Sequence, residues 1–385
     1  MRDSWAEVTL GDIATIVPGK YLPKTEYVED GDYFVFGSNS IMGKYSKFLI
    51  EPPHTVMAAI GAYAGAVRYS HQPSWVNNNA FGLLVKPSVL PEYFYLWLNS
   101  MLDLSTVVAG TGQPYVQRPS LSATKLGLPP LSEQKRIIDV MASVDAYIAA
   151  LRQLQKEART ARDAVLHELL ESIAVAPKRK LKSLTSKIGS GATPRGGEAV
   201  YTSSGVTLIR SQNVHDGRFL HEGLVAVGET AAKVLEGVSV EGNDVLINIT
   251  GASVARACIV DQNVLPARVN QHVSILRTDR SQLLPEFLLQ ILLGKKMKSF
   301  LLGISGSGTT RQAITKAQLE DLEVLVPQLD EQKRIVGLVS SIDSVVRSTE
   351  LALTDAQRVR TGLLSDLLSG DHEIPEAYDR MLGAA

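Results

Sequence analysis

The stretch PPLSEQKRIIDVM at residues 129–141 returns almost unchanged as PQLDEQKRIVGLV at residues 327–339, 198 positions further along the chain. Over the longer windows 129–148 and 327–346, 9 of 20 positions are identical. A match of this density at one fixed offset indicates an internal duplication, and the duplication organises everything else in the sequence.

Each copy opens a long run of apolar residues with helical spacing, and Ser132 and Asp330 are candidate N-caps. With Ile137 and Ile335 as a positions of a heptad, the expected d residues include Val140, Tyr147, Leu154, Leu338 and Val345. The e positions are apolar too, among them Met141, Ile148, Leu169, Val339, Val346 and Leu367. The pattern predicts a helix over about 132–173 and a second one 198 residues later. A two-fold arrangement of the repeats would pair them as an antiparallel coiled coil.

The segments ahead of the helices repeat more loosely and in the same order. LPEYFYLWL at 90–98 matches LPEFLLQIL at 284–292, and each predicts a short helix with proline at its first position. We therefore expect an α+β protein with an internal pseudo-two-fold repeat, in which two globular modules are joined by two long helices. The expected parts are a module at 1–128, a helix at 129–177, a module at 178–326, and a helix with a tail at 327–385.

Composition restricts the class of protein. The chain has 385 residues, 45% of them hydrophobic, and a single cysteine, Cys258, so intramolecular disulfides and cysteine-cluster zinc sites are excluded. With neither a secretory signal nor an apolar run of membrane-spanning length in the sequence, we expect a cytoplasmic protein. Net charge is −1 overall but +5 over 178–326 and −4 over 327–385. The basic module suits phosphate contact, and the acidic end suits protein contact.

Sequence motifs for nucleotide binding, methyl transfer and metal binding are weak. GSNSIMGK at 37–44 has the wrong glycine spacing for a P-loop, and EPPH at 51–54 departs from the methyltransferase turn at both ends. The histidines show no spacing suited to a metal, and His215 and His221 are better placed as solvent-exposed loop residues. We expect no catalytic residue and no metal site in this chain, and predict a protein that binds and recognises.

Two copies of Pro-x-Leu-x-Glu-Gln-Lys-Arg-Ile, each following a divergent module and opening a long helix, resemble the specificity subunit of type I restriction-modification systems. The resemblance covers essentially the whole chain, and RSQNV, LPEF and GTGQ are typical of the modules. It implies two target recognition domains, each reading one half of a split sequence in double-stranded DNA. It also implies that the helices set the spacer between the halves and dock two methyltransferase subunits.

In that family the chemistry belongs to the partners. The resemblance implies that S-adenosylmethionine, ATP and Mg²⁺ are held by the methyltransferase and by an optional restriction (motor-nuclease) subunit, with no cofactor in this chain. The chain would then be a non-catalytic subunit without a membrane role. An alternative that the sequence leaves open is a coiled-coil scaffold with two protein-binding modules and no DNA role.

Base edges are read by amide, guanidinium and hydroxyl groups, so polar loop residues are the candidates for DNA contact. In the first module these are Gln113, Tyr115, Gln117 and Arg118, then Asn77, Asn78 and Asn79, then Ser38, Asn39 and Lys44. In the second they are Thr309, Thr310, Arg311 and Gln312, then Arg210, Gln212 and Asn213, then Asn270, Gln271 and His272. For any one of them, a loop residue that only faces water or caps a turn is the alternative.

The duplicated charges of the motif form a separate group, Lys135, Arg136, Lys333 and Arg334. Their repetition suggests a symmetric role, either against a partner subunit or against the phosphates of the spacer DNA. The alternative is a solvated first turn of each helix.

Overall fold

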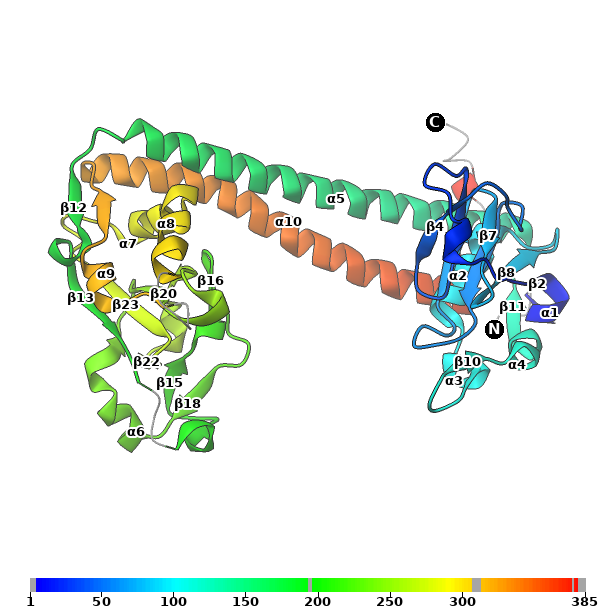
Figure 1. The fold of residues 1–385 in the computed structure, drawn as a ribbon, viewed down its shortest axis with the longest axis horizontal. Helices are drawn as coiled ribbons and strands as arrows, with labels where there is room; N and C mark the ends of the chain where they lie inside the picture. Colours follow the sequence, from blue (N-terminus) through cyan, green and yellow to red (C-terminus); the bar gives the residue numbers. More distant parts are fainter. Residues whose placement is uncertain (1–4, 193–195, 307–312, 376, 380–385) are drawn as a thin grey trace. The chain divides into compact units, whose positions relative to one another are not determined.

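The structure is a computed structural model, and it describes residues 5–192, 196–306, 313–375 and 377–379. The chain forms two compact units, shown with the course of the chain in Figure 1. The first unit comprises residues 1–152 and 351–385, and the second comprises residues 153–350. Both divisions fall inside the long helices, whereas the sequence placed its boundaries at the helix ends.

The first unit is built on a four-stranded antiparallel sheet in the order β2 (Ala14–Pro18), β8 (Ala80–Val85), β5 (His54–Ala58), β6 (Val67–Ser70). A three-stranded sheet has the order β4 (Ile41–Tyr45), β3 (Tyr33–Phe36), β7 (Ser74–Val76), with β3 and β7 parallel. Two small ribbons pair β1 (Ala6–Thr9) with β11 (Lys125–Leu128), and β9 (Val108–Ala109) with β10 (Tyr115–Val116).

Helix α2 (Pro91–Met101) covers the four-stranded sheet with a face of large apolar residues, since Tyr93, Phe94, Trp97 and Leu98 are buried. Its proline stands in the first turn, where the missing N–H has no helical partner to lose. The shorter helices are α1 (Leu10–Ile13), α3 (Leu104–Val107), α4 (Arg118–Ala123) and the 3₁₀ turn η1 (Lys24–Glu26).

The second unit repeats this plan. Its four-stranded sheet has the order β13 (Thr185–Ser190), β23 (Val273–Thr278), β20 (Val245–Asn248), β21 (Ala257–Ile259). The second sheet has five strands, β14 (Tyr201–Thr202), β18 (Val225–Val227), β15 (Val206–Ile209), β22 (Ala267–Val269), β19 (Ser239–Val240), with β15 and β22 parallel. The ribbons are β12 (Lys178–Lys180) with β24 (Glu323–Leu325), and β16 (Val214–His215) with β17 (Arg218–Phe219).

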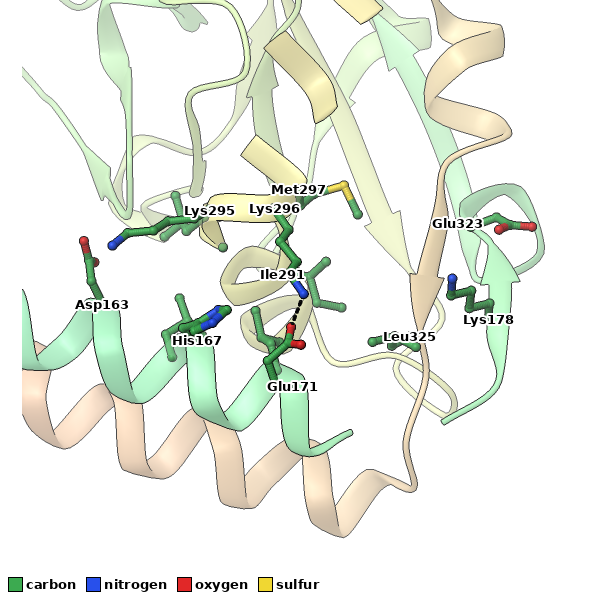
Figure 2. A pocket seen from close by; sticks show the side chains of 14 residues that line it. Asp163, His167, Glu171, Lys178, Ile291, Lys295, Lys296, Met297, Glu323 and Leu325 are labelled. Atoms are coloured by element: carbon green, nitrogen blue, oxygen red, sulfur yellow. Dashed lines mark hydrogen bonds and ion pairs between the residues drawn. The ribbon is translucent and has the colours of Figure 1, made fainter. Parts of the chain in front are cut away.

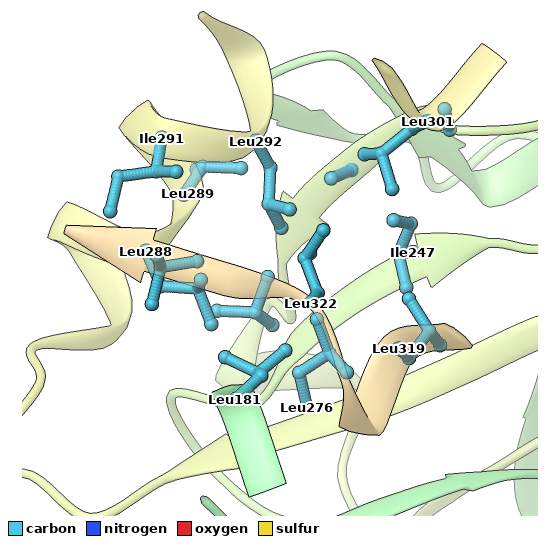
Figure 3. Packing of buried hydrophobic residues seen from close by; sticks show 14 of the residues in the cluster. Leu181, Ile247, Leu276, Leu288, Leu289, Ile291, Leu292, Leu301, Leu319 and Leu322 are labelled. Carbon is cyan, nitrogen blue, oxygen red and sulfur yellow. The ribbon is translucent and has the colours of Figure 1, made fainter. Parts of the chain in front are cut away.

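The helices of the second unit are α6 (Glu229–Val234), α7 (Pro285–Leu293), α8 (Lys295–Ser305) and α9 (Lys316–Glu320). The 3₁₀ turns are η2 (Leu181–Ser183), η3 (Gly197–Val200), η4 (Ser211–Asn213), η5 (Glu236–Val238), η6 (Gly251–Ser253) and η7 (Gln262–Val264). Figure 3 shows the core between α7 and the sheet, where Leu288, Leu292 and Leu276 meet Leu319 and Leu322. Because both units share the sheet orders and the same parallel pair, the duplication predicted from the motif is confirmed.

The long helices are α5 (Leu131–Ser172) and α10 (Leu329–Ser369). Each begins one residue before the predicted N-cap, so Ser132 and Asp330 lie in the first turn and are not the caps. Within the second unit, Arg162 Nε donates to Asp343 Oδ1 at 2.7 Å. Within the first, Arg360 Nη2 donates to Asp145 Oδ2 at 2.9 Å. In the second unit Arg159 also pairs with Glu350, so a lower residue of α5 meets a higher one of α10. In the first unit Ile137 and Met141 share a core cluster with Leu364 and Leu367, whereas Asp145 meets Arg360. The helices are therefore antiparallel in each unit. The Arg162–Asp343 and Arg360–Asp145 pairs also correspond residue by residue under the 198-residue offset.

The heptad register differs from the prediction. The buried positions after Ile137 include Met141 and Ile148, and the expected d residues Tyr147 and Leu154 are 56% and 47% exposed. The second copy behaves alike, with Val339 buried and Val345 exposed. The expected a positions Ile137 and Ile335 are buried, and of the d residues named from the sequence only Val140 packs against the core. The buried residues Met141, Ile148 and Val339 are predicted apolar e positions. Both the d positions and the e positions are apolar in the sequence. Packing against the modules buries the e positions, which lie four residues after each a position.

The repeated glutamine of the motif holds each helix to its own module. Gln134 is fully buried, its Nε2 donates to the carbonyls of Ser88 (3.1 Å) and Pro129 (2.9 Å), and its Oε1 accepts from Leu90 N (2.7 Å). Gln332 does the same with Gln282 O, Pro327 O and Leu284 N, each at 2.9 Å. Leu90 and Leu284 are the N-cap residues of α2 and α7, so the motif ties the long helix to the short one.

None of the helices in the described part of the chain is long and apolar enough to span a membrane.

Candidate nucleic-acid interface

Three loops of the first unit meet at one junction, held by backbone hydrogen bonds. Asn77 N donates to Phe36 O at 2.8 Å, Ala59 N donates to Asn79 O at 2.8 Å, and Val116 N donates to Ala59 O at 2.9 Å. These bonds join the turn after β3, the loop before β8, and the segment around β10. We call this place the loop junction of the first unit. Three groups of residues that the sequence singled out separately therefore lie together.

The second unit has the same junction with the same three bonds. Asn270 N donates to Ile209 O at 3.0 Å, Ile249 N to His272 O at 2.9 Å, and Ile314 N to Ile249 O at 2.7 Å. The turn after β15, the loop before β23 and the segment leading into α9 thus meet as their counterparts do. Of the sequence candidates, Thr309, Thr310, Arg311 and Gln312 lie outside the described residues.

Most candidates of the first unit present their polar groups to solvent. The exposed side chains at the junction are Asn39, Asn78, Asn79, Gln113, Tyr115, Gln117 and Arg118. The exposed Arg118 guanidinium stands 5.6 Å from the centroid of the Phe81 ring, within the range of a cation–π contact. Ser38 is half-buried, and the carbonyl of Asn39 accepts a hydrogen bond from Arg68. Lys44 is exposed but lies back along β4, opposite Phe34, and is not part of the junction.

Three of the asparagines predicted to contact DNA are buried, and their side chains form hydrogen bonds to the backbone. Asn77 bonds to the N–H of Asn78 at 2.7 Å and to Leu22. Asn213 Nδ2 donates to the carbonyls of Leu220 (3.0 Å) and Glu222 (3.1 Å). Asn270 Oδ1 accepts from His272 N at 3.0 Å. A buried amide that holds a turn is not available to a base, so we remove all three from the candidate interface.

The remaining candidates of the second unit are Arg210, Gln212, Gln271 and His272. Arg210 Nη2 donates to Gly223 O at 2.6 Å, its guanidinium stands 5.3 Å from the Tyr201 ring centroid, and Gln212 Nε2 donates to the same carbonyl at 3.2 Å. His272 Nδ1 is 2.5 Å from Thr250 Oγ1, and its Nε2 is 2.9 Å from Gln271 Nε2. These side chains are held in fixed directions, which favours selective reading over adaptable contact.

Sequence reasoning missed two exposed tyrosines near the junction of the first unit. Tyr63 is 52% exposed on the turn after β5, which is tied to the junction by Gly61 N donating to Pro114 O at 2.8 Å. Tyr21 is 70% exposed and precedes Leu22, the backbone partner of Asn77. An exposed tyrosine offers a hydroxyl for phosphate contact and an apolar ring for a thymine methyl group in duplex DNA. The available signal was GAYAGA at 61–66, a glycine-rich turn with one large residue that has no core to fill.

The motif charges do not behave as a symmetric set. Lys135 pairs with Asp139 at 2.9 Å, Lys333 with Asp330 at 3.2 Å, and Arg334 with Glu331 at 2.6 Å, all on the helix surface. The Arg136 side chain is only 7% exposed, and its Nη1 donates to Asp379 Oδ2 at 3.0 Å. Arg136 is therefore not available to a partner or to spacer DNA, and we correct that assignment.

Cys258 and His54 are buried groups with shifted pKa values. In the described part of the chain, no group of three His, Cys, Asp or Glu side chains could hold a metal ion. Burial raises the pKa of the Cys258 thiol to about 12, so this cysteine is not a thiolate at neutral pH. Burial lowers the pKa of His54, whose Nε2 is 2.7 Å from Ser74 Oγ. These groups are parts of the core.

Figure 2 shows side chains that line a hollow in the second unit, between α5 and the start of α8. The hollow has a volume of about 290 Å³. Lys296 Nζ reaches Glu171 Oε1 at 2.7 Å across it. Its charged lining is balanced, with three lysines against Asp163, Glu171 and Glu323. A balanced, largely apolar hollow is a poor phosphate surface, so the loop junctions are the better candidates for nucleic acid.

Comparison with known proteins agrees with the repeated architecture. The family model described as "Type I restriction modification DNA specificity domain" matches the chain twice, at residues 2–159 and 197–355. Each match contains one loop junction and the first part of one long helix. The chain belongs to this family of type I restriction modification DNA specificity domains.

Individual relatives are distant in sequence and similar in fold. The chain is 20% identical to the type I restriction enzyme MjaVIII specificity subunit of Methanocaldococcus jannaschii, over 96% of this chain and 93% of that protein. The S subunit of a type I restriction-modification system from M. genitalium superposes with a TM-score of 0.60 at 16% identity, covering 94% and 96% of the two chains. A chain from a study of type I restriction-modification complex assembly has a TM-score of 0.58 at 17% identity, covering 97% and 99%.

Proposed function

We propose that this protein is the DNA specificity subunit of a type I restriction-modification complex, and that each unit reads one half of a bipartite target in double-stranded DNA. The observation that carries the proposal is the loop junction. It occurs once in each unit with the same three backbone bonds, while the polar side chains on it differ. A repeated frame with different side chains is what two readers of different half-sites require.

The partners and cofactors follow from the same proposal. Two methyltransferase subunits, and in a complete system restriction subunits, would supply catalysis together with S-adenosylmethionine, ATP and Mg²⁺. This chain would contribute no catalytic group and would act in the cytoplasm. The long helices would set the spacing of the half-sites and dock the methyltransferase subunits, and the exposed charges Lys135, Lys333 and Arg334 are available for that contact.

Methylation mapping tests the proposal directly. Genomic DNA from the host, and from a strain lacking this gene, is read for methylated bases. We expect one bipartite motif to lose methylation in the deletion strain and to regain it on complementation. Complementation with Gln117→Ala should change methylation in one half of the motif only. Unchanged methylation in the deletion strain would contradict the proposed function.

A binding measurement tests the role without catalysis. The purified chain with its methyltransferase partners should bind a duplex carrying the mapped motif, with affinity that falls steeply as salt rises because phosphate contacts release counterions. The isolated chain incubated with labelled S-adenosylmethionine and the same duplex should transfer no methyl group. Transfer by the isolated chain would overturn the non-catalytic assignment.

A further inference from the structure

The second unit contains a cleft rich in arginine, away from the turns that carry its base-reading candidates. The cleft has a volume of about 770 Å³ and lies between the β16–β17 hairpin, β21, α7 and the two long helices. All its lining residues belong to this unit. Its cationic side chains are Arg159, Arg162, Arg218, Arg256, Lys298 and Arg347.

Some of these cations already have anionic partners. The six cations of the cleft face five acidic lining residues. Arg162 pairs with Asp343 at 2.7 Å and lies 3.6 Å from Asp163, and Lys298 pairs with Asp216 at 2.7 Å. Glu350 is shared, because it pairs with Arg159 and lies 3.5 Å from Arg218. One carboxylate between two guanidinium groups leaves most of their N–H donors for another anion.

Two arginines are unpaired. Among the described residues, the side chains of Arg256 and Arg347 make no ion pair or hydrogen bond, and of the acidic lining residues only Glu286 is likewise without an ion pair. Arg347 is exposed and Arg256 is half-buried. A partly buried, unpaired guanidinium in a cleft has a strong preference for an anionic ligand, and its planar fork matches a phosphate.

The cleft continues from the loop junction through one short loop. Thr250, whose hydroxyl contacts His272 at the junction, opens the turn that ends at Arg256. Asn248 N donates to Arg256 O at 2.8 Å, and Gly217 N donates to Ala257 O at 2.9 Å, which fixes the β16–β17 hairpin beside this turn. The loop junction and Arg256 therefore lie at the two ends of one short turn.

The hollow at the matching strand and short helix of the first unit, which no residue of the long helices lines, has different chemistry. It has a volume of about 520 Å³, and Tyr69 and Tyr95 stand where the second unit has Ile259 and Leu289. Its only arginine is Arg68, which is already bonded to the carbonyl of Asn39. Among the described residues, this arginine cluster lines the cleft of the second unit and not the hollow of the first, and three of its six cations, Arg218, Arg256 and Lys298, belong to the basic segment 178–326.

We propose that this cleft binds the phosphate backbone of the DNA whose bases are read at the neighbouring loop junction, with Arg256 and Arg347 as the primary contacts. The inference rests on the proposed function and adds a second contact surface to it. Glu350 competes with phosphate for Arg159 and Arg218. The contacts contribute affinity and salt dependence, and no sequence information.

Two substitutions with opposite expected signs test the cleft. The full chain with its methyltransferase partners is titrated with a duplex carrying the mapped motif and with a scrambled duplex, over a range of salt concentrations. For Arg256→Ala/Arg347→Ala we expect affinity for both duplexes to fall on the order of tenfold at low salt, and the slope of log K against log salt to become less steep by about 2. For Glu350→Gln we expect tighter binding of both duplexes and a steeper slope.

Arg358→Ala is the matched control, because Arg358 is an exposed arginine of the same helix that pairs with Asp355. It should bind like the wild type. Wild-type salt dependence in both test variants overturns the phosphate cleft while leaving the proposed function intact. A changed sequence preference, or a loss of partner assembly with unchanged DNA affinity, overturns it as well. If the wild type shows no salt-dependent DNA binding, the proposed function itself fails and this inference falls with it.

Discussion

The two helix starts carry nearly the same sequence in different surroundings. In the first unit, Glu133 and Arg136 are buried, Glu133 accepting from Trp5 Nε1 at 3.1 Å and Arg136 reaching Asp379. In the second unit, the matching Glu331 and Arg334 are more exposed and pair with each other. Gln134 and Gln332, by contrast, make equivalent bonds in both units. The repeat preserves the three hydrogen bonds of the motif glutamine, which we call the clamp. The charged residues of the motif, by contrast, have different partners in the two units.

The largest effect should come from the clamp, and it should be equal in the two units. Gln134→Leu and Gln332→Leu each leave a buried N–H and two carbonyls without a partner, which should cost about 3 kcal/mol in the affected unit. Native-state hydrogen exchange measures this loss unit by unit, with Lys135→Ala as an exposed control. Loss of protection in only one of the two units would break the equivalence that we draw here.

Substitution of the matching motif arginines, Arg136 and Arg334, should change the stability of the two units by different amounts. Arg136→Ala removes a buried guanidinium and its bond to Asp379, and should destabilise the first unit by about 2 kcal/mol. Arg334→Ala removes an exposed i,i+3 pair and should leave the second unit's exchange unchanged. The same hydrogen-exchange measurement compares them. Equal losses for both variants would show that the two environments are alike after all.

A smaller effect should distinguish the loop junction from the helix surface. Tyr63→Ala removes an exposed ring near the junction and should weaken binding of the duplex about tenfold, or about 1.4 kcal/mol, through the loss of its contact with the groove edge or the backbone. Tyr147→Ala is the matched control, since Tyr147 is similarly exposed but lies on α5. Fluorescence anisotropy with the mapped duplex measures both. A junction role for Tyr63 is untenable if the two variants bind alike.

The smallest effect should be a pH response confined to the first unit. Burial lowers the pKa of His54 from its usual 6.5, so the folded unit keeps the neutral ring at a pH where the unfolded chain takes up a proton. Stability from this residue is present above pH 6.5 and is lost as pH falls from there through the lowered pKa. In the second unit, the position that corresponds to His54 is Asp244, the residue just before β20. Asp244 pairs with Arg277, so the second unit has no imidazole at this position.

Hydrogen exchange at pH 7 and pH 5.5, corrected for the intrinsic rates, measures this response. Protection in the first unit should decrease on acidification, and His54→Gln should remove most of that decrease. Should the variant respond to acid as the wild type does, the pH dependence arises from other groups.

The fold was largely predictable because its signals are local. The repeated motif, the proline-started helices and the apolar stripes each report on neighbouring residues, and the antiparallel helices followed from the repeat. The heptad register was not predictable, since two adjacent apolar stripes fitted the sequence and only contact with the modules selects between them. Arg136 was misassigned for a similar reason, because its partner Asp379 lies 243 residues away in the tail.

The candidate interface was predictable as a set of loops and not residue by residue. Asn77 and Asn78 are adjacent in a run of asparagines, yet one is buried in a turn and the other is exposed. Nothing in the one-dimensional pattern separates an amide that caps a turn from one that faces a ligand. Tyr63 and Tyr21 were missed because a lone aromatic residue in a sequence usually belongs to a core.

The ion pairs between α5 and α10 have an implication for how such a chain could arise. Asp145 and Arg162 sit on one helix, and Asp343 and Arg360 sit on the other, 198 residues on. A single ancestral helix with this aspartate and this arginine would already be complementary to an inverted copy of itself. Fusion of two such copies would then have required no new contact between the helices, and the modules would have been free to diverge.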